Sequence, residues 1–133
     1  MGLIHTHCLS NGLIGSLIKA IQFVKANNRN EFHLQRDLDL THNEYANFQK
    51  LHYFALCVRK EGKSGYWLIT KWGGAFLRNE LAIPYKVETL DNIIQRKSME
   101  MRMIKDYFPA YDTGYFQTNF HSVLITNQQA LII

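Results

Sequence analysis

Residues 41–70 read THNEYANFQKLHYFALCVRKEGKSGYWLIT, and this stretch decides the fold class. It opens with a capping box, in which the Thr41 hydroxyl accepts a backbone N–H three residues on and the Glu44 carboxylate reaches back. Apolar residues then recur at helical spacing, which predicts a helix from about His42 to Leu56. The expected members of its buried stripe are Tyr45, Phe48, Leu51, His52, Ala55 and Leu56.

The period of the sequence changes after this helix. Residues 57–60 and 66–69 are typical of two strands, and the glycines between them suit a hairpin loop. Thr70 can then cap a further helix over 71–80, inside which Gly73 and Gly74 indicate close backbone packing.

Two segments upstream complete the order of elements. Residues 13–26 predict a helix whose apolar stripe begins at Leu13, and residues 31–38 predict a short second helix or turn around Phe32. Three helices followed by a two-stranded hairpin is the order of a winged helix-turn-helix. The sequence therefore predicts an α+β fold with this domain over residues 1–82.

Residues 83–133 predict a β-rich C-terminal extension that packs on the first domain as one structural unit. Residues 83–97 favour a second hairpin that turns at Asp91 and Asn92, and alternating methionines over 99–103 favour a strand. Six aromatic residues follow, as an extra sheet or as a surface for dimerisation or another partner: Tyr107, Phe108, Tyr111, Tyr115, Phe116 and Phe120. We expect the apolar end, 130–133, to be covered by the body or a second subunit, and the chain to form a homodimer.

Three short stretches resemble a known group of proteins. Residues 50–56 (KLHYFAL) resemble the K-L-x-Y-W-G-L stretch of small bacterial and phage winged-helix proteins. Residues 67–77 (WLITKWGGAFL) are similar to their W-x-L-T-x-x-G-x-x-F stretch, and residues 83–85 (IPY) to their V-P-x-Y. The resemblance covers about residues 30–96 and implies a winged-helix fold, with a looser similarity to MarR-like and ArsR-like regulators. Ala55 stands where the group usually has Gly, and the Cys-x-x-Cys ribbon of some members has no counterpart.

Composition limits the classes of protein that fit. With 47% hydrophobic and 20% charged residues over 133 positions, the chain has the composition of one globular domain. Its apolar runs are too short for a membrane span. The formal net charge of +4 permits a polyanionic partner, but the basic residues are spread thinly along the chain.

The solvent face of the helix over 42–56 carries side chains that can read DNA. Asn43 and Asn47 can form paired hydrogen bonds to adenine, and Lys50 can reach guanine or phosphate. The hairpin cations Arg59, Lys60 and Lys63 either hold phosphates or form a solvated tip. The first interpretation is a non-enzymatic, transcription-regulator-like protein that binds double-stranded DNA.

Aromatic residues beside this helix support a second interpretation. Tyr53, Phe54 and Tyr66 lie near the helix end and the hairpin, and aromatic side chains are enriched at interface cores. The same fold would then be a protein-binding module. One example is an anti-CRISPR-like phage or mobile-element factor that inhibits a host nucleic-acid-handling complex.

No pattern for catalysis, a metal or a cofactor is recognisable. His5, His7 and Cys8 lie close together, but zinc sites need four ligands and no second close pair follows. Nucleophile-elbow, phosphate-loop and His-Glu-x-x-His motifs are lacking, so the sequence predicts no enzyme. Two cysteines make no disulfide framework, which favours the cytoplasm, and Cys57 is expected to be a buried, inert thiol.

Overall fold

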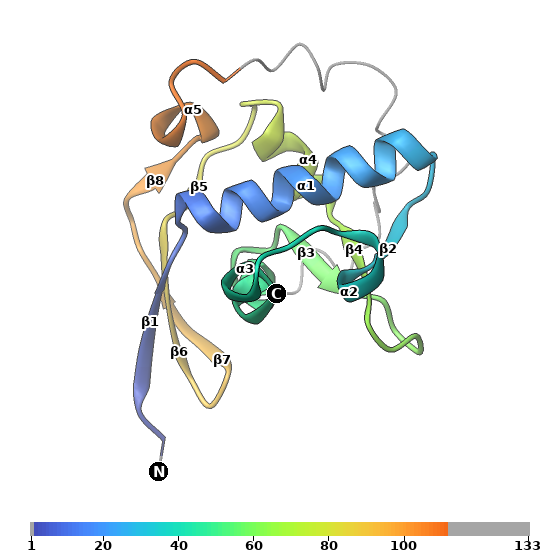
Figure 1. Ribbon diagram of the computed structural model, residues 1–133. Helices are drawn as coiled ribbons and strands as arrows, with labels where there is room; N and C mark the ends of the chain where they lie inside the picture. The colour runs from blue at the N-terminus through green and yellow to red at the C-terminus, as the bar shows by residue number, and fades with distance from the viewer. Residues whose placement is uncertain (1, 112–133) are drawn as a thin grey trace.

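The computed structural model describes residues 2–111 as short helices that alternate with short strands (Figure 1). The helices are α1 (Asn11–Asn27), α2 (Leu34–Asp37), α3 (His42–Asn47), the 3-10 helix η1 (Phe48–Phe54), α4 (Lys71–Leu77) and α5 (Ile104–Tyr107). The strands are β1 (Ile4–Cys8), β2 (Glu31–His33), β3 (Cys57–Arg59), β4 (Tyr66–Ile69), β5 (Ile83–Pro84), β6 (Lys86–Leu90), β7 (Ile93–Lys97) and β8 (Met101–Arg102).

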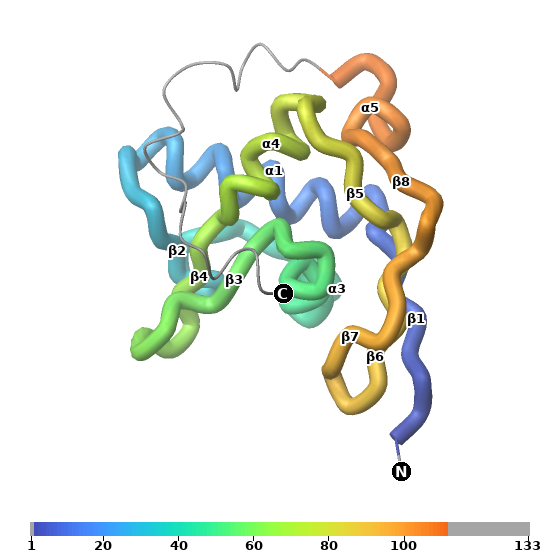
Figure 2. The backbone as a smooth tube through the Cα atoms, turned by 180° about the vertical axis from the view of Figure 1, so that it is seen from behind, coloured from blue at the N-terminus to red at the C-terminus, as the bar shows by residue number. Residues whose placement is uncertain are grey.

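Within residues 2–111 the strands form three antiparallel sheets, ordered β2–β4–β3, β1–β6–β7 and β5–β8. The β3–β4 hairpin lies on one side of α3 and the β1–β6–β7 sheet lies on the other, as the opposite views of Figures 1 and 2 both show. One buried core extends from α1 through the β2–β4–β3 sheet to Val87 and Ile104. The chain is therefore mixed α and β, which agrees with the predicted class. None of the helices in this range has the length and apolarity to cross a membrane.

Helix α1 confirms the helix predicted over 13–26 and extends it at its N-terminus. It begins earlier because the Ser10 hydroxyl accepts the backbone N–H of Leu13 at 3.2 Å, an N-cap that satisfies one free donor. It ends at Asn27, because the following residue, Asn28, has a left-handed φ of 50° that turns the chain. The expected apolar stripe is buried: Leu13, Leu17, Ala20, Ile21 and Val24.

The segment 31–38, predicted as a short helix or turn, is a strand followed by a helix. Strand β2 pairs with β4, which sets Phe32 opposite Trp67, and only α2 is helical. A three-residue strand is too short to show an alternating pattern, so its pairing with a distant strand decides its conformation.

The helix predicted over 42–56 is confirmed at its start and corrected in its middle. The Thr41 hydroxyl accepts the Glu44 N–H at 3.1 Å, and the Glu44 carboxylate accepts the Thr41 N–H at 2.9 Å. After Asn47 the α-helix tightens into η1, which ends at Phe54, before Ala55 with its left-handed φ of 62°. Tyr45, expected to be buried, is 45% exposed.

Side-chain spacing explains the change of helix type. A 3-10 helix has three residues per turn, so residues three apart share a face. Phe48, Leu51 and Phe54 have this spacing, and all three are buried in η1. The tighter helix therefore places these three side chains in the core.

Thr70 joins the end of η1 to α4. Its hydroxyl caps α4 by accepting the Gly73 N–H at 3.0 Å and donates to the Ala55 carbonyl at 2.5 Å. Its backbone N–H donates to the Leu56 carbonyl at 3.1 Å. Gly73 packs directly on that carbonyl, which confirms the predicted close approach. Helix α4 ends at Leu77 rather than at residue 80, since Asn79 is left-handed with φ of 59°.

The predicted second hairpin is confirmed as β6 and β7. Asp91 and Asn92 turn the chain with φ of 51° and 66°. The methionine segment contributes only the short strand β8, which pairs with β5. Strand β1 joins β6, so the first strand of the chain shares a sheet with the second hairpin. Of the aromatic segment, Tyr107, Phe108 and Tyr111 pack against the core. The predictions for Tyr115, Phe116, Phe120 and the apolar end lie outside the described residues.

A pair of glycine substitutions tests the packing at Thr70. Gly73→Ala places a methyl group against the Leu56 carbonyl, and such overpacking costs about 2 kcal/mol. Gly15→Ala in α1 meets open space and should stabilise the helix by about 0.5 to 1 kcal/mol. Urea unfolding of both variants measures these changes, and equal effects would contradict the close contact.

Candidate functional site

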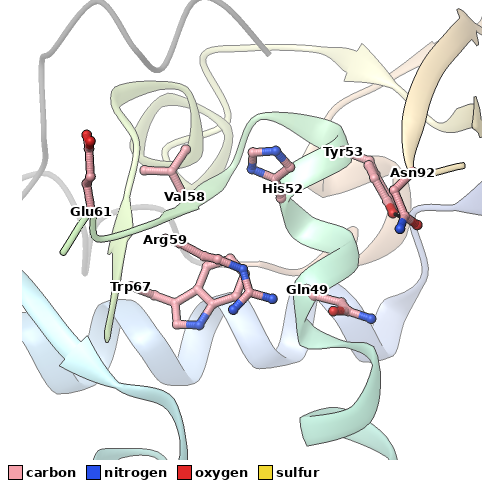
Figure 3. Close-up of a pocket in the computed structure, with 8 residues that line it drawn as sticks. All are labelled: Gln49, His52, Tyr53, Val58, Arg59, Glu61, Trp67 and Asn92. Carbon is pink, nitrogen blue, oxygen red and sulfur yellow. Dashed lines mark hydrogen bonds between the residues drawn. The ribbon is translucent and has the colours of Figure 1, made fainter. Parts of the chain in front are cut away.

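A groove lies between η1 and the β3–β4 hairpin and has a cavity volume of about 500 Å³. Figure 3 shows its lining residues: Gln49, His52, Tyr53, Val58, Arg59, Glu61, Trp67 and Asn92. A second cavity of about 370 Å³ continues toward α2 and α3 and shares Gln49, Arg59 and Trp67 with the first. We call these two adjacent cavities the η1–hairpin groove.

Arg59 lies at the centre of the η1–hairpin groove. Its guanidinium covers the indole of Trp67 at 4.7 Å from the ring centroid, and the β3–β4 register places the two residues opposite each other. Trp67 is only 2% exposed and meets the Phe48 ring edge-on at 5.4 Å. Arg59 is exposed and has no ion pair to a described residue. The groove therefore presents a cation on a rigid aromatic floor.

The wall formed by η1 is tied to the β1–β6–β7 sheet. The Tyr53 hydroxyl donates to the Asn92 side-chain oxygen at 3.0 Å, and the His7 ring stacks on Tyr53 at 4.8 Å. A ring nitrogen of His7, Nε2, lies 3.0 Å from the Thr89 hydroxyl. These contacts fix one end of the groove with side chains from separate parts of the chain.

Two histidines near this wall have lowered pKa values. Burial, the charge of Lys50 and the neighbouring His5 lower the pKa of His7. Burial and the Arg59 charge lower the pKa of His52, whose Nδ1 atom is buried and has no hydrogen-bond partner among residues 2–111. Both rings therefore favour the neutral form.

The other two hairpin cations are held by a carboxylate. Lys63 Nζ lies 2.5 Å from Glu31 Oε2, and Lys60 Nζ lies 3.6 Å from Glu31 Oε1. The hydrogen bond from Lys63 lowers the pKa of Glu31, so this carboxylate is charged at neutral pH. Glu31 projects from β2, which pairs with β4. The hairpin tip is thus partly neutralised by its own sheet.

The residues expected on one DNA-reading helix face lie elsewhere around α3. Asn43, Asn47 and Lys50 line a separate cavity of about 250 Å³ with Cys8 and the first turn of α1. The Asn47 side chain donates to the Asn43 carbonyl at 2.8 Å, so part of its hydrogen-bonding capacity is used within α3. The six predicted nucleic-acid residues therefore occupy three places: this cavity, the η1–hairpin groove and the Glu31 cluster.

The predicted aromatic surface is also divided. Phe54 is 5% exposed and belongs to the core, so it offers no surface to a partner. Tyr53 lines the η1–hairpin groove, and the Tyr66 hydroxyl accepts a hydrogen bond from Arg36 at 2.5 Å. The 3-10 spacing of η1 turns Phe54 inward, which a purely α-helical prediction cannot show.

Sequence reasoning missed Gln49, Trp67 and Asn92 as groove residues. Trp67 could have been found from the sequence, because the register of the predicted hairpin places it opposite Arg59. Asn92 has none, because it reaches the groove from the turn of a separate hairpin. Gln49 lies at the junction of α3 and η1, where the helix period changes.

The described residues hold no cluster for metal binding or thiol chemistry. Within 2–111, no group of three or more histidine, cysteine or acidic side chains comes together. Cys57 is fully buried, and burial raises the pKa of its thiol far above the usual range. The predicted burial of Cys57 is therefore confirmed.

Acidification should destabilise the fold through His7 and His52. Their folded pKa values lie below the usual 6.5, so the unfolded chain binds protons more readily as the pH falls through that value. Urea unfolding at about pH 7.5 and about pH 5.5 measures the resulting loss of stability. The double variant His7→Gln, His52→Gln should lose less than the wild type, and an equal loss would contradict this assignment.

Comparisons with protein-family models, with curated proteins and with solved structures find no match to this chain. What the protein does must therefore be inferred from the residues of its own groove, hairpin and α3 surface.

Proposed function

We propose that the chain is a winged-helix protein that binds double-stranded DNA without enzymatic activity. The observation that carries the proposal is the exposed surface of α3 beside the β3–β4 hairpin, with Arg59 in the groove between them. The order α1, β2, α2, α3, β3, β4 and the sheet β2–β4–β3 support a helix-turn-helix with a hairpin wing.

The α3 surface suits base reading because its side chains are not buried in the core and can contact a ligand. No side chain of α3 is buried. The exposed residues of α3 include His42 and Asn43, and Gln49 is exposed at the start of η1. The imidazole and amide groups of these side chains can pair with base edges in a major groove. On this proposal α3 enters the major groove, and the hairpin contacts the adjacent backbone.

The charges support a modest electrostatic contribution. Lys50 of η1 and Arg59 of β3 have no ion pair among the described residues, whereas Lys60 and Lys63 share Glu31. Each phosphate contact releases counterions, so the affinity must fall as salt rises. With few free cations, non-specific binding should be on the order of micromolar at low salt.

The same contacts weigh against the protein-binding module. Of its three predicted residues, Phe54 is buried, the Tyr53 ring is stacked on His7, and Tyr66 is held by Arg36. These aromatic side chains serve the chain's own packing. No described contact favours the anti-CRISPR-like alternative over DNA.

A charge reversal in the η1–hairpin groove tests DNA binding. Arg59→Glu should weaken binding to a labelled random duplex by about tenfold and reduce the salt dependence by about one unit of log–log slope. Fluorescence anisotropy at low and near-physiological salt measures both quantities. Lys105→Glu makes the same charge change on α5, which lies away from the hairpin in Figures 1 and 2, and should have little effect.

The proposal fails if the wild type does not bind the duplex even at low salt. It also fails if Arg59→Glu and Lys105→Glu weaken binding equally, because the interaction would then depend on net charge alone.

A second pair of variants tests whether Glu31 restrains the hairpin cations. Glu31→Gln frees Lys60 and Lys63 for phosphates, so it should strengthen binding and steepen the salt slope by about two units. Asp39→Asn changes the net charge equally, but Asp39 is exposed, lies outside the groove lining and forms none of the ion pairs found in residues 2–111. Equal anisotropy curves for the two variants would show that Glu31 has no special effect.

A further inference from the structure

Strand β1 has one unpaired edge. It pairs with β6 on one side, and the sheet order β1–β6–β7 leaves its other side without a described partner. Figures 1 and 2 view the molecule from opposite sides, and in both β1 lies at the outer margin with no described element beyond it. Such an edge presents backbone donors and acceptors that can pair with another strand.

The backbone directions identify which residues form this edge. The Leu9 N–H donates to the Tyr85 carbonyl at 2.8 Å, just beyond the register that pairs His7 with Val87. In an antiparallel ladder, every second residue pair is joined by backbone hydrogen bonds. Since Leu9 is bonded to Tyr85, the backbone N–H and C=O groups of His7 and His5, two and four residues earlier, also point toward β6. The backbones of Ile4, Thr6 and Cys8 therefore face outward.

This edge lacks the features that usually prevent pairing between chains. Residues 2–12 contain no proline and no charged side chain. Near its end, Leu3 is 75% exposed and Ile4 is 54% exposed, and Ile93 of β7 is 66% exposed. Lysines, prolines and bulges normally blunt an edge strand, so an uncharged, apolar edge is suited to a partner strand.

The sequence around Thr6 matches its own reverse in residue type. Reading outward, His5 corresponds to His7, Ile4 to Cys8, and Leu3 to Leu9. Antiparallel pairing of two identical strands places each residue opposite its counterpart on the other side of a two-fold axis. A strand with this symmetry and no charge is complementary to a second copy of itself.

We propose that two copies of the chain form a two-fold dimer through antiparallel pairing of their β1 strands, centred on Thr6. The sheet then continues across the axis in the order β7–β6–β1–β1–β6–β7. The two Thr6 residues exchange backbone hydrogen bonds, Ile4 faces the partner's Cys8, and His5 faces the partner's His7. The exposed apolar side chains at the end of β1 gain cover in this arrangement.

Sedimentation equilibrium of the full chain over a concentration series, with EDTA present so that paired histidines hold no metal, tests the dimer. The wild type should be dimeric at high concentration. Thr6→Pro removes an outward N–H and leaves the β1–β6 bonds in place, so it should weaken the dimer by at least about tenfold. Thr6→Val keeps the N–H and should remain dimeric.

A charge-swap pair tests the position of the axis even if the proline variant fails to fold. Thr6→Lys alone and Thr6→Glu alone place like charges opposite each other and should be monomeric. Their equimolar mixture should dimerise, because only the mixed pair sets opposite charges together. A wild type that is monomeric throughout overturns the proposal. The proposal is also overturned if the Thr6→Lys variant, the Thr6→Glu variant and their mixture all dimerise to the same extent.

Discussion

Two hydrogen bonds from Thr70, to the carbonyls of Ala55 and Leu56, hold the candidate site together. They fix the left-handed turn that ends η1, and they start α4 at the same point. Because β3 leaves this turn and β4 ends at Ile69, directly before Thr70, the hairpin and η1 keep one mutual orientation. Gly73 allows this arrangement, since a side chain there would collide with the Leu56 carbonyl. The η1–hairpin groove is thus set by a buried backbone contact rather than by the residues that line it.

Several cations near α3 and the hairpin have a partner within the protein itself. Glu31 holds two hairpin lysines, Glu44 holds Lys19, and Arg59 lies on Trp67. Exposed ion pairs of this kind contribute little stability, so a polyanion can compete for them. The arrangement suits a protein whose specificity comes from α3 side chains and whose electrostatic attraction is weak. It also gives Glu31 a larger influence on affinity than its single charge would suggest.

Local signals predict the elements that depend on neighbouring residues. The capping box at Thr41, the apolar stripe of α1, the glycine loop after Arg59 and the turn at Asp91 each form where the sequence indicates. Strand β2 and the 3-10 form of η1 are not predictable in this way, because they depend on the pairing of Phe32 with Trp67 and on core packing. Arg59 is identifiable as a site residue from its place in the hairpin. Asn92 reaches the groove only through the tertiary fold.

The most direct test of the DNA-binding surface is an NMR titration of the isotopically labelled full chain with duplex DNA at low salt. Backbone amide shifts report contacts residue by residue, which affinity alone cannot do. We expect the largest changes over residues 42–50 and 57–66, with little change in α5. Changes confined to another surface, or no changes at any DNA concentration, would contradict the proposal that α3 and the hairpin form a nucleic-acid interface.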